Sequence, residues 1–573
     1  MTSPSPPPLP LERNGELTRL DPQNVSALLA EHRLWLQTAG REGKRAKLRR
    51  CDLSGLNLEA ADLRHADLRD SRLEGTRLMN SRLNFADLSG VTHLLPHQLA
   101  GADVSGITLP EGIDLYDRLK HIEEVTISGR SVFFLLLLAV AYTWLTIGTT
   151  SDVDLLTNAS TSPLPIIFTE IPIRGFYWAA PLILLGCYVY FHLHLLHLWQ
   201  DLAALPAFFP DGRALDDKAH PWLLIGLINA HCQRLRDTRP MLAGLQNALS
   251  IILAWYIIPL TIAAIWLRYL PRHDWYGTGF HIAILMIAAV TGSVFYRLTT
   301  ITLEGKKQSG LLLRGVKSAS RRGIITAEAI IAIAVFVLLP VLSYGAMTPG
   351  GRSAGADPRY WVPAIMNALG YSPFANFSDK DISTRPIDWM ENASSVDMVK
   401  GADLKNADLY HAEAAGAFLV KADLRGADLR HIDLELGNLR QANLEEADLR
   451  EANLLQADLR GSDLDGADLR GAVLLRARLE NARLNRADLR ETFLNEAALH
   501  NADLSMADLR NAQLNRADLR GATLEFAIMG GVNLQGADLS GVLGLECGQL
   551  EAALTDSNTR LPANLDCSAI SQP

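Results

Sequence analysis

The sequence predicts a multi-domain membrane protein in which two solenoid domains flank an all-α transmembrane domain of about five helices. Two observations lead to this prediction: an apolar residue recurs every five positions in two separate runs, and five long apolar stretches lie between those runs. Charged residues make up 20% of the 573 residues, yet the mean hydropathy is +0.09. A chain of this length is too long for a single core. Polar repeats and apolar spans must therefore occupy different parts of it.

The first 25 residues, which begin MTSPSPPPLPLERNGE, are rich in proline and polar residues and predict a disordered tail. No apolar run follows a basic stretch, so we expect no secretory signal peptide and a cytoplasmic N-terminus. Residues 26–112 are then expected to form a capping helix, a short solenoid and its cap. Within 28–40, the residues Leu28, Leu29, His32 and Leu36 have helical spacing, which predicts a helix that covers the first coil.

The short solenoid is predicted from leucines that recur at intervals of five from Leu48 to Leu88. Solenoids need end caps because each coil buries its faces only against its neighbours. The segment 89–102 (SGVTHLLPHQLAGA) aligns without gaps with 540–553 (SGVLGLECGQLEAA). Both solenoids are therefore expected to end with the same kind of cap.

Residues 113–345 are predicted to be the transmembrane domain, because five stretches are long enough to span or nearly span ~30 Å of hydrocarbon. These stretches are 131–149, 176–199, 248–267, 279–296 and 324–344. A sixth apolar stretch, 221–230, is short and is expected to be interfacial or re-entrant.

The orientation follows from the Lys and Arg residues in the segments around the spans, which number 3, 1, 5, 2 and 7 in chain order. Since positive charge is retained in the cytoplasm, this alternation predicts a multi-pass protein of the cell (inner) membrane with its N-terminus in the cytoplasm. Five spans would place the C-terminal solenoid on the opposite side. Four or six spans would leave both solenoids in the cytoplasm.

A stripe of ionisable residues ends the second span, where Tyr190, His194, His197 and Asp201 share one helix face. Two histidines and an aspartate can bind a metal, and intramembrane ionisable residues are candidate functional sites. His197 lies near the expected headgroup level, however. We therefore favour an interfacial belt of aromatic and histidine residues, with a metal or proton site on His194, His197 and Asp201 as the alternative.

A linker over 346–398 is expected to precede a long solenoid over 399–541, which a cap and tail over 542–573 complete. From Val399 to Leu539 the five-residue register does not slip in about 29 repeats, and the position two before the apolar residue is usually alanine. A period of five fits neither a helix nor a flat strand. It predicts a coil that turns a corner every five residues, with a core that includes Leu429, Leu449, Leu469, Leu489 and Leu509.

These repeats, seen as ADLRG, ADLRH, ANLEE and ADLRE, resemble the A-(D/N)-L-x-x unit of the pentapeptide-repeat family. The resemblance implies right-handed, four-sided (quadrilateral) β-helices with about 20 residues per coil. At ~4.8 Å per coil, the long solenoid would form a rod on the order of 34 Å long. The chain as a whole also looks like bacterial membrane proteins that join such repeats to a helical block, a group whose resemblance implies no function for individual residues.

Residues that are 20 apart should stack in columns along the rod, and one column combines aspartates with arginines of the same repeats. The pairs are Asp428 and Arg430, Asp448 and Arg450, Asp468 and Arg470, and Asp488 and Arg490. Interleaved opposite charges neutralise one another. We therefore interpret this column as a self-compensated, solvated charge ladder.

The function predicted from these features is a membrane-anchored, non-enzymatic scaffold whose rods dock an unidentified protein partner. The expected partners are therefore the lipid bilayer and a protein. We find no phosphate loop, nucleophile elbow, zinc-protease motif or dinucleotide fingerprint, and we expect no catalytic residue and no cofactor. A transporter- or channel-like protein with accessory solenoids is the alternative. A net charge of −9 argues against nucleic-acid binding.

A less favoured third interpretation comes from the family resemblance, because some soluble members are acidic, DNA-shaped rods that bind topoisomerases. Residues 401–540 hold 16 basic and 24 acidic residues, a net charge of −8. Anchoring beside several membrane helices disfavours this role. The five cysteines lack metal-binding spacing, and whether Cys547 and Cys567 pair is left open.

Overall fold

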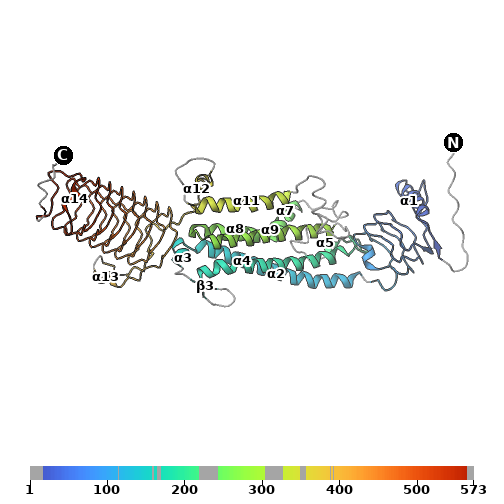
Figure 1. Ribbon diagram of the computed structural model, residues 1–573. Helices are drawn as coiled ribbons and strands as arrows, with labels where there is room; N and C mark the ends of the chain where they lie inside the picture. The colour runs from blue at the N-terminus through green and yellow to red at the C-terminus, as the bar shows by residue number, and fades with distance from the viewer. Residues whose placement is uncertain are drawn as a thin grey trace, which may run out of the picture. The chain divides into compact units, whose positions relative to one another are not determined.

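The protein is described here by a computed structural model (Figure 1), which describes residues 17–113, 115–157, 161–163, 170–218, 243–303, 327–348, 357–387, 389–390, 393–563 and 565. The chain forms two compact units. Unit 1 comprises Met1–Tyr142, Ile183–Thr261 and Met286–Ala332, and unit 2 comprises Thr143–Leu182, Ile262–Leu285 and Ile333–Pro573. Each boundary falls inside an apolar helix. The chain therefore passes from one unit to the other five times, each time within a helix.

The N-terminal solenoid belongs to unit 1 and begins with strand β1 (Thr18–Arg19), which pairs in parallel with β2 (Cys51–Asp52). Helix α1 (Pro22–Gln37) follows β1, at the place where the sequence predicts a capping helix. Single parallel bridges then join residues that are 20 apart, such as Asp62 and Arg82. The leucines from Leu48 to Leu88 are buried. Of the tail expected over 1–25, residues 1–16 lie outside the described part, and residues 17–25 include β1 and the beginning of α1.

Four helices among the described residues are long and apolar enough to cross a membrane: Leu119–Thr149, Ile173–Ala203, Gly244–Arg272 and Trp275–Thr302. They correspond to the following elements: α2 (Tyr116–Thr149); α4 (Ile173–Ala203); α7 (Ala243–Ile251), the π-helical turn η4 (Ile252–Tyr256), α8 (Ile257–Tyr269) and the 3-10 turn η5 (Leu270–Arg272); and α9 (Trp275–Leu303). The fifth predicted span, 324–344, overlaps α11 (Ala327–Met347). Within α11, the part that qualifies as an apolar helix is Phe336–Met347, which is shorter than the four helices above.

Short elements connect these helices. Helix α3 (Asp152–Thr157) and an antiparallel pair of strands, β3 (Thr161–Pro163) and β4 (Glu170–Pro172), lie between α2 and α4. Helix α5 (Leu215–Lys218) follows α4. The stretch 221–230, predicted to be interfacial or re-entrant, lies outside the described residues.

The C-terminal solenoid belongs to unit 2, and its parallel bridges also join residues that are 20 apart, from Asp403 with Asp423 to Asp518 with Asp538. One continuous core of leucines and alanines runs through it. The five leucines predicted from the register, Leu429, Leu449, Leu469, Leu489 and Leu509, are each at most 1% exposed. The alanines two positions earlier are buried beside them. The five-residue period thus produces an interior of one large and one small apolar side chain per repeat.

The solenoid begins before the predicted boundary at 399. The expected linker contains α12 (Pro358–Ala368) and α13 (Ala393–Asp397). It also contains a stretch that bridges to the first repeats, Asn376 with Glu413 and Asp381 with Phe418. Phe377 lies in the core of the solenoid, and Ile382 packs against that core. These two residues are five apart but two positions out of phase with Val399, so the repeat pattern does not reveal them.

The two solenoids end in equivalent caps, as their aligned sequences predict. In η1 (Pro96–Leu99), Gln98 Nε2 donates to the carbonyls of Leu73 and Thr76 at 2.8 and 2.7 Å. In α14 (Cys547–Leu550), Gln549 Nε2 donates to the carbonyls of Leu524 and Ala527 at 3.0 and 2.8 Å. Each glutamine therefore satisfies two carbonyl groups of the coil beneath it, which a cap must do.

Cys547, in the C-terminal cap, is disulfide-bonded. Cys567, which the sequence suggested as a possible partner, lies outside the described residues. Cys51 and Cys187 are free thiols.

Candidate functional site

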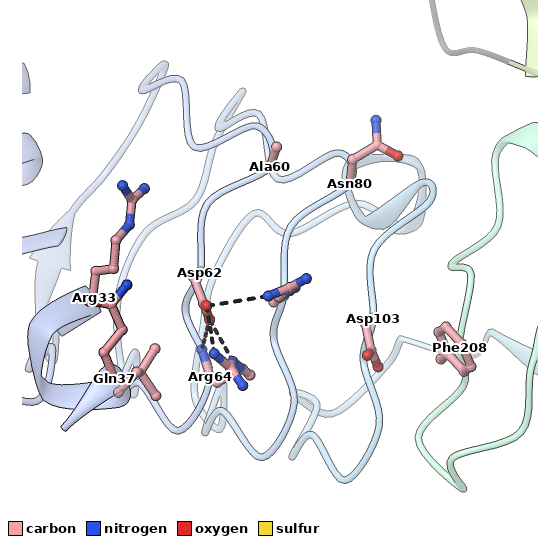
Figure 2. Close-up of a pocket in the computed structure, with 10 residues that line it drawn as sticks. Arg33, Gln37, Ala60, Asp62, Arg64, Asn80, Asp103 and Phe208 are labelled. Atoms are coloured by element: carbon pink, nitrogen blue, oxygen red, sulfur yellow. Dashed lines mark hydrogen bonds and ion pairs between the residues drawn. The ribbon is translucent and has the colours of Figure 1, made fainter. Parts of the chain in front are cut away.

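The N-terminal solenoid carries a groove with a volume of about 560 Å³ on one face (Figure 2). Its floor is a column of outward side chains from successive coils, in which Asp62 bridges to Arg82, Arg82 to Asp103 and Asp103 to Phe208. Ala60 and Asn80 line it from the neighbouring corner of the coils. Helix α1 contributes Arg33, Leu36 and Gln37. The groove therefore lies between helix α1 and the chain around Phe208, which we call the Phe208 segment. All of its lining residues belong to unit 1.

Helix α1 is held against the first coil by a buried histidine. His32 is fully buried, and its Nδ1 accepts the backbone N–H of Ala46 at 3.1 Å. The Trp35 ring contacts both His32 and His65. Burial lowers the pKa of His32 despite the opposing effect of Asp62. A neutral His32 is thus part of what positions the helix.

Acidification should therefore loosen α1. The pKa of His32 is below its ordinary value of 6.5 when α1 is docked. As the pH falls below 6.5, His32 therefore binds a proton more readily when α1 is undocked, and the stability of the docked helix decreases. We expect hydrogen exchange of the α1 amides, corrected for intrinsic rates, to be faster at about pH 5.5 than at about pH 7.5. His32→Gln should remove this difference. An equal pH dependence in the variant would contradict the role given to His32.

Charges on the groove floor are only partly compensated. Arg64 Nε and Nη2 donate to the two carboxylate oxygens of Asp62, each at 2.8 Å. Arg82 lies 3.8 Å from the same carboxylate. Burial alone would raise the pKa of Asp62, but the hydrogen bonds and charge of Arg64 lower it overall. Asp62 is therefore ionised at neutral pH and is already engaged by Arg64.

The charge ladder of the long solenoid is compensated throughout. In each repeat the arginine donates two hydrogen bonds to its own aspartate, as Arg470 does to Asp468 at 2.8 and 2.6 Å. Its Nε also lies 3.5 Å from the aspartate of the next coil, Asp488. The same geometry recurs in the predicted pairs Asp428 with Arg430, Asp448 with Arg450 and Asp488 with Arg490. This column leaves little uncompensated charge for a ligand.

The histidines of the predicted stripe lie close to backbone carbonyl groups. His194 Nε2 lies 3.1 Å from the carbonyl of Val125, and His197 Nδ1 lies 3.0 Å from the carbonyl of Leu193. Within the described ranges, no group of three or more His, Cys, Asp or Glu side chains is placed to hold a metal ion, and Asp201 belongs to none. His220, His231 and Cys232 lie outside those ranges.

A different histidine is buried in the helices of unit 1. His192 is 1% exposed, and the rings of Tyr188, Trp255 and Phe295 surround it at 4.3 to 5.5 Å. Its Nδ1 is hydrogen-bonded to the carbonyl of Tyr188, while Nε2 has no partner among the described residues. The π-helical turn η4 contains Trp255, whose carbonyl accepts the Tyr188 hydroxyl at 2.8 Å. His192 is not one of the four stripe residues that the sequence singles out.

Within unit 2, residues at the ends of the apolar helices contact the first coils of the long solenoid. Arg268 forms a 2.6 Å ion pair with Asp152, in which both side chains are less than a fifth exposed. The other oxygen of Asp152 accepts the backbone N–H of Asn376 at 2.7 Å. His273 Nδ1 lies 3.1 Å from Asp408, in the first repeats of the solenoid. Val153 and Leu156 of α3 pack on the solenoid core. Helix α3 therefore covers the first coils of the long solenoid.

Sequence reasoning missed both the groove and this junction. The signal for the groove was present, because Arg72, Arg77 and Arg82 stand directly before the core leucine, where most repeats have Asp or Asn. The junction left no comparable signal. It joins residues more than 100 positions apart without a shared motif.

Comparison with known proteins supports the repeat architecture. The family model for pentapeptide repeats matches residues 44–80, 57–92, 402–441, 438–474, 477–516 and 507–541. No curated protein matches the chain at a significant level.

Several solved structures also match. A trypsin-treated form of QnrB1, a plasmid-mediated fluoroquinolone resistance protein, is 18% identical over 34% of this chain and 82% of its own, with a TM-score of 0.22. A pentapeptide-repeat protein of the Arabidopsis thaliana thylakoid lumen is 30% identical over 22% of this chain and 77% of its own, with a TM-score of 0.17. HetL of Nostoc, a pentapeptide-repeat protein involved in heterocyst differentiation regulation, is 26% identical over 35% of this chain and 90% of its own, with a TM-score of 0.14. Because these TM-scores are low, the assignment depends on the repeats themselves. With the family model matching the repeats before and after its apolar helices, the chain belongs to the pentapeptide-repeat family.

Proposed function

We propose that this protein is a membrane-anchored, non-enzymatic scaffold whose solenoids are docking surfaces for a protein partner. The observation that carries the proposal is the junction in unit 2. Arg268, Asp152 and His273 hold the first coils of the long solenoid directly on the helix ends, and α3 covers its core. A rod fastened in this way presents its outer faces in a fixed orientation relative to those helix ends. Such pre-organisation lowers the entropic cost of docking.

Affinity purification of the full-length protein from native membranes tests this function. We expect a stoichiometric protein partner to co-purify with the natural chain and to be lost from a variant whose long solenoid is unfolded by Leu469→Asp. The same protein set with both chains, or no stoichiometric partner with either, would argue against docking by the long solenoid.

We further propose that the protein resides in the cell membrane with its N-terminal solenoid in the cytoplasm and its C-terminal solenoid on the opposite side. The alternating loop charge supports this orientation. The disulfide of Cys547 supports it independently, because disulfides persist in oxidising compartments and are rare in the cytosol. The proposal requires an odd number of spans, and α11 would be the fifth.

Thiol labelling checks this orientation, but the natural cysteines are unsuitable reporters. Burial raises the pKa of Cys51 to about 11, and Cys547 is oxidised. Glu59→Cys and Glu445→Cys introduce thiols at exposed, equivalent positions one residue after a core leucine. With Cys187 and Cys232 replaced by serine, an impermeant maleimide should label the Glu445→Cys protein in intact spheroplasts and the Glu59→Cys protein only after lysis. Protection of both before lysis would mean an even number of spans.

A second candidate function is transport or gating by the helices, with the solenoids as accessories. The observation in its favour is the buried His192 beside a π-helical turn, since such turns are frequent at functional sites. Uptake assays on proteoliposomes containing the natural chain or His192→Phe would separate this function from docking.

A further inference from the structure

The groove on the N-terminal solenoid differs from the charge ladder of the long solenoid because its basic and acidic side chains are not equal in number. Three arginines line it, Arg33, Arg64 and Arg82, against two carboxylates, Asp62 and Asp103. The lining therefore has one surplus positive charge. In the ladder of the long solenoid, by contrast, each arginine is matched by the aspartate of its own repeat.

The surplus is located on Arg82 and Arg33. Arg82 takes the position directly before the core leucine, where the ladder has aspartate, and the residue after that leucine is Asn84 instead of an acid. Arg82 forms an ion pair with Asp62 at 3.8 Å, but Arg64 already binds this carboxylate with two 2.8 Å hydrogen bonds. Arg33 forms no ion pair within the part of the chain that the structure describes. Both guanidinium groups thus have hydrogen-bonding capacity for a further anion.

The shape and neighbours of the groove restrict what that anion can be. Guanidinium groups bind carboxylate and phosphate in two-point geometry. A dianionic phosphate would meet the carboxylates Asp62 and Asp103 on the floor, whereas one carboxylate would neutralise the surplus charge. The floor extends over three coil spacings, from Asp62 to Phe208, which is ~14 Å or about four residues of extended chain. Leu36 and Phe208 add apolar surface to the lining.

We propose that this groove is a docking site for an extended acidic segment of a partner protein, one carboxylate of which binds Arg82 and Arg33. The inference rests on the proposed docking function, and it assigns the N-terminal solenoid a partner of defined chemistry. Gln37 adds an amide group that suits a peptide backbone.

Fluorescence anisotropy on the detergent-purified full-length chain provides the test. The probe is a fluorescein-labelled peptide of alternating Glu and Ser with blocked ends, and the matched probe has Gln in place of Glu. At low ionic strength we expect the Glu peptide to bind and the Gln peptide to bind at least about tenfold more weakly. Arg82→Gln and Arg33→Gln should each weaken binding of the Glu peptide about tenfold, the effect of one charged hydrogen bond.

Arg77→Gln is the matched control, because Arg77 holds the same repeat position on the adjoining face and does not line the groove. It should leave binding within about twofold. Equal losses in Arg77→Gln and Arg82→Gln, equal binding of both peptides, or no binding of the Glu peptide would overturn the proposal. Inorganic phosphate that displaces the peptide at an equal concentration would also overturn it, in favour of a small-anion site. None of these results depends on the long solenoid, so co-purification of a partner through that solenoid would stand if the groove proposal failed.

Discussion

Leu469→Asp is expected to unfold the long solenoid. Leu469 is completely buried midway along a continuous core. The substitution removes a large apolar side chain and buries a carboxylate with no basic partner in that core. The combined cost should exceed about 5 kcal/mol, comparable to the whole stability of many domains. In the full-length protein, limited proteolysis should cut within 399–541, and the β-sheet circular dichroism signal should fall.

The control for this experiment is Leu475→Asp, in the next repeat. Leu475 stands one position after a core leucine and is only partly buried, so its carboxylate can reach water. We expect protease resistance close to that of the natural chain. If both variants resist proteolysis equally, the assignment of inward and outward positions is wrong.

Arg268→Met is expected to detach the base of the long solenoid from the helix ends. The substitution leaves the Asp152 carboxylate, 15% exposed, without its 2.6 Å partner. Breaking one side of a buried ion pair costs about 3 kcal/mol or more. Arg268 also donates to the carbonyl of Thr150 at 2.8 Å, so the segment before α3 loses a second contact. The backbone N–H of Asn376 donates a 2.7 Å hydrogen bond to Asp152. Hydrogen exchange of this N–H should accelerate by at least about a hundredfold.

A second substitution separates charge from packing in this experiment. Asp152→Asn keeps an acceptor for Asn376 but removes the negative charge. The double variant Arg268→Met with Asp152→Asn should therefore exchange more slowly than Arg268→Met alone, because no uncompensated charge remains. Additive effects of the two substitutions would mean that the ion pair does not hold the junction.

The repeat is the part of the fold that is most accessible from sequence, because every fifth side chain faces the same interior. Leu429 to Leu509 could be assigned to the core from this register alone, and Gln98 and Gln549 occupy corresponding positions in the two aligned caps. The stretch around Phe377 escaped detection because it pairs with the solenoid out of phase. The fastening of α3 escaped because Asp152 and Asn376 meet only in the folded chain.

Candidate sites were harder to predict than the core. The aspartate–arginine ladder could be predicted from the sequence because both partners lie in one repeat, two residues apart. The groove was not, because its lining depends on α1 and on the Phe208 segment, which approach the solenoid from separate parts of the sequence. Likewise, the histidines in an obvious pattern, His194 and His197, bond to nearby carbonyls. The buried His192 has no pattern around it.

From Asp403 to Leu543, bridged partners in the long solenoid are always 20 residues apart, so each added coil lengthens the rod by the same step. Its first coils are fastened by α3, and its last coils are closed by Gln549 and α14. Neither end depends on the number of coils between them. Insertion or deletion of four repeats would therefore move the cap by one coil, ~4.8 Å, while leaving both ends and the ladder chemically unchanged. Evolution can thus adjust the reach of this rod in discrete steps by duplicating or deleting 20-residue blocks, without redesigning any contact.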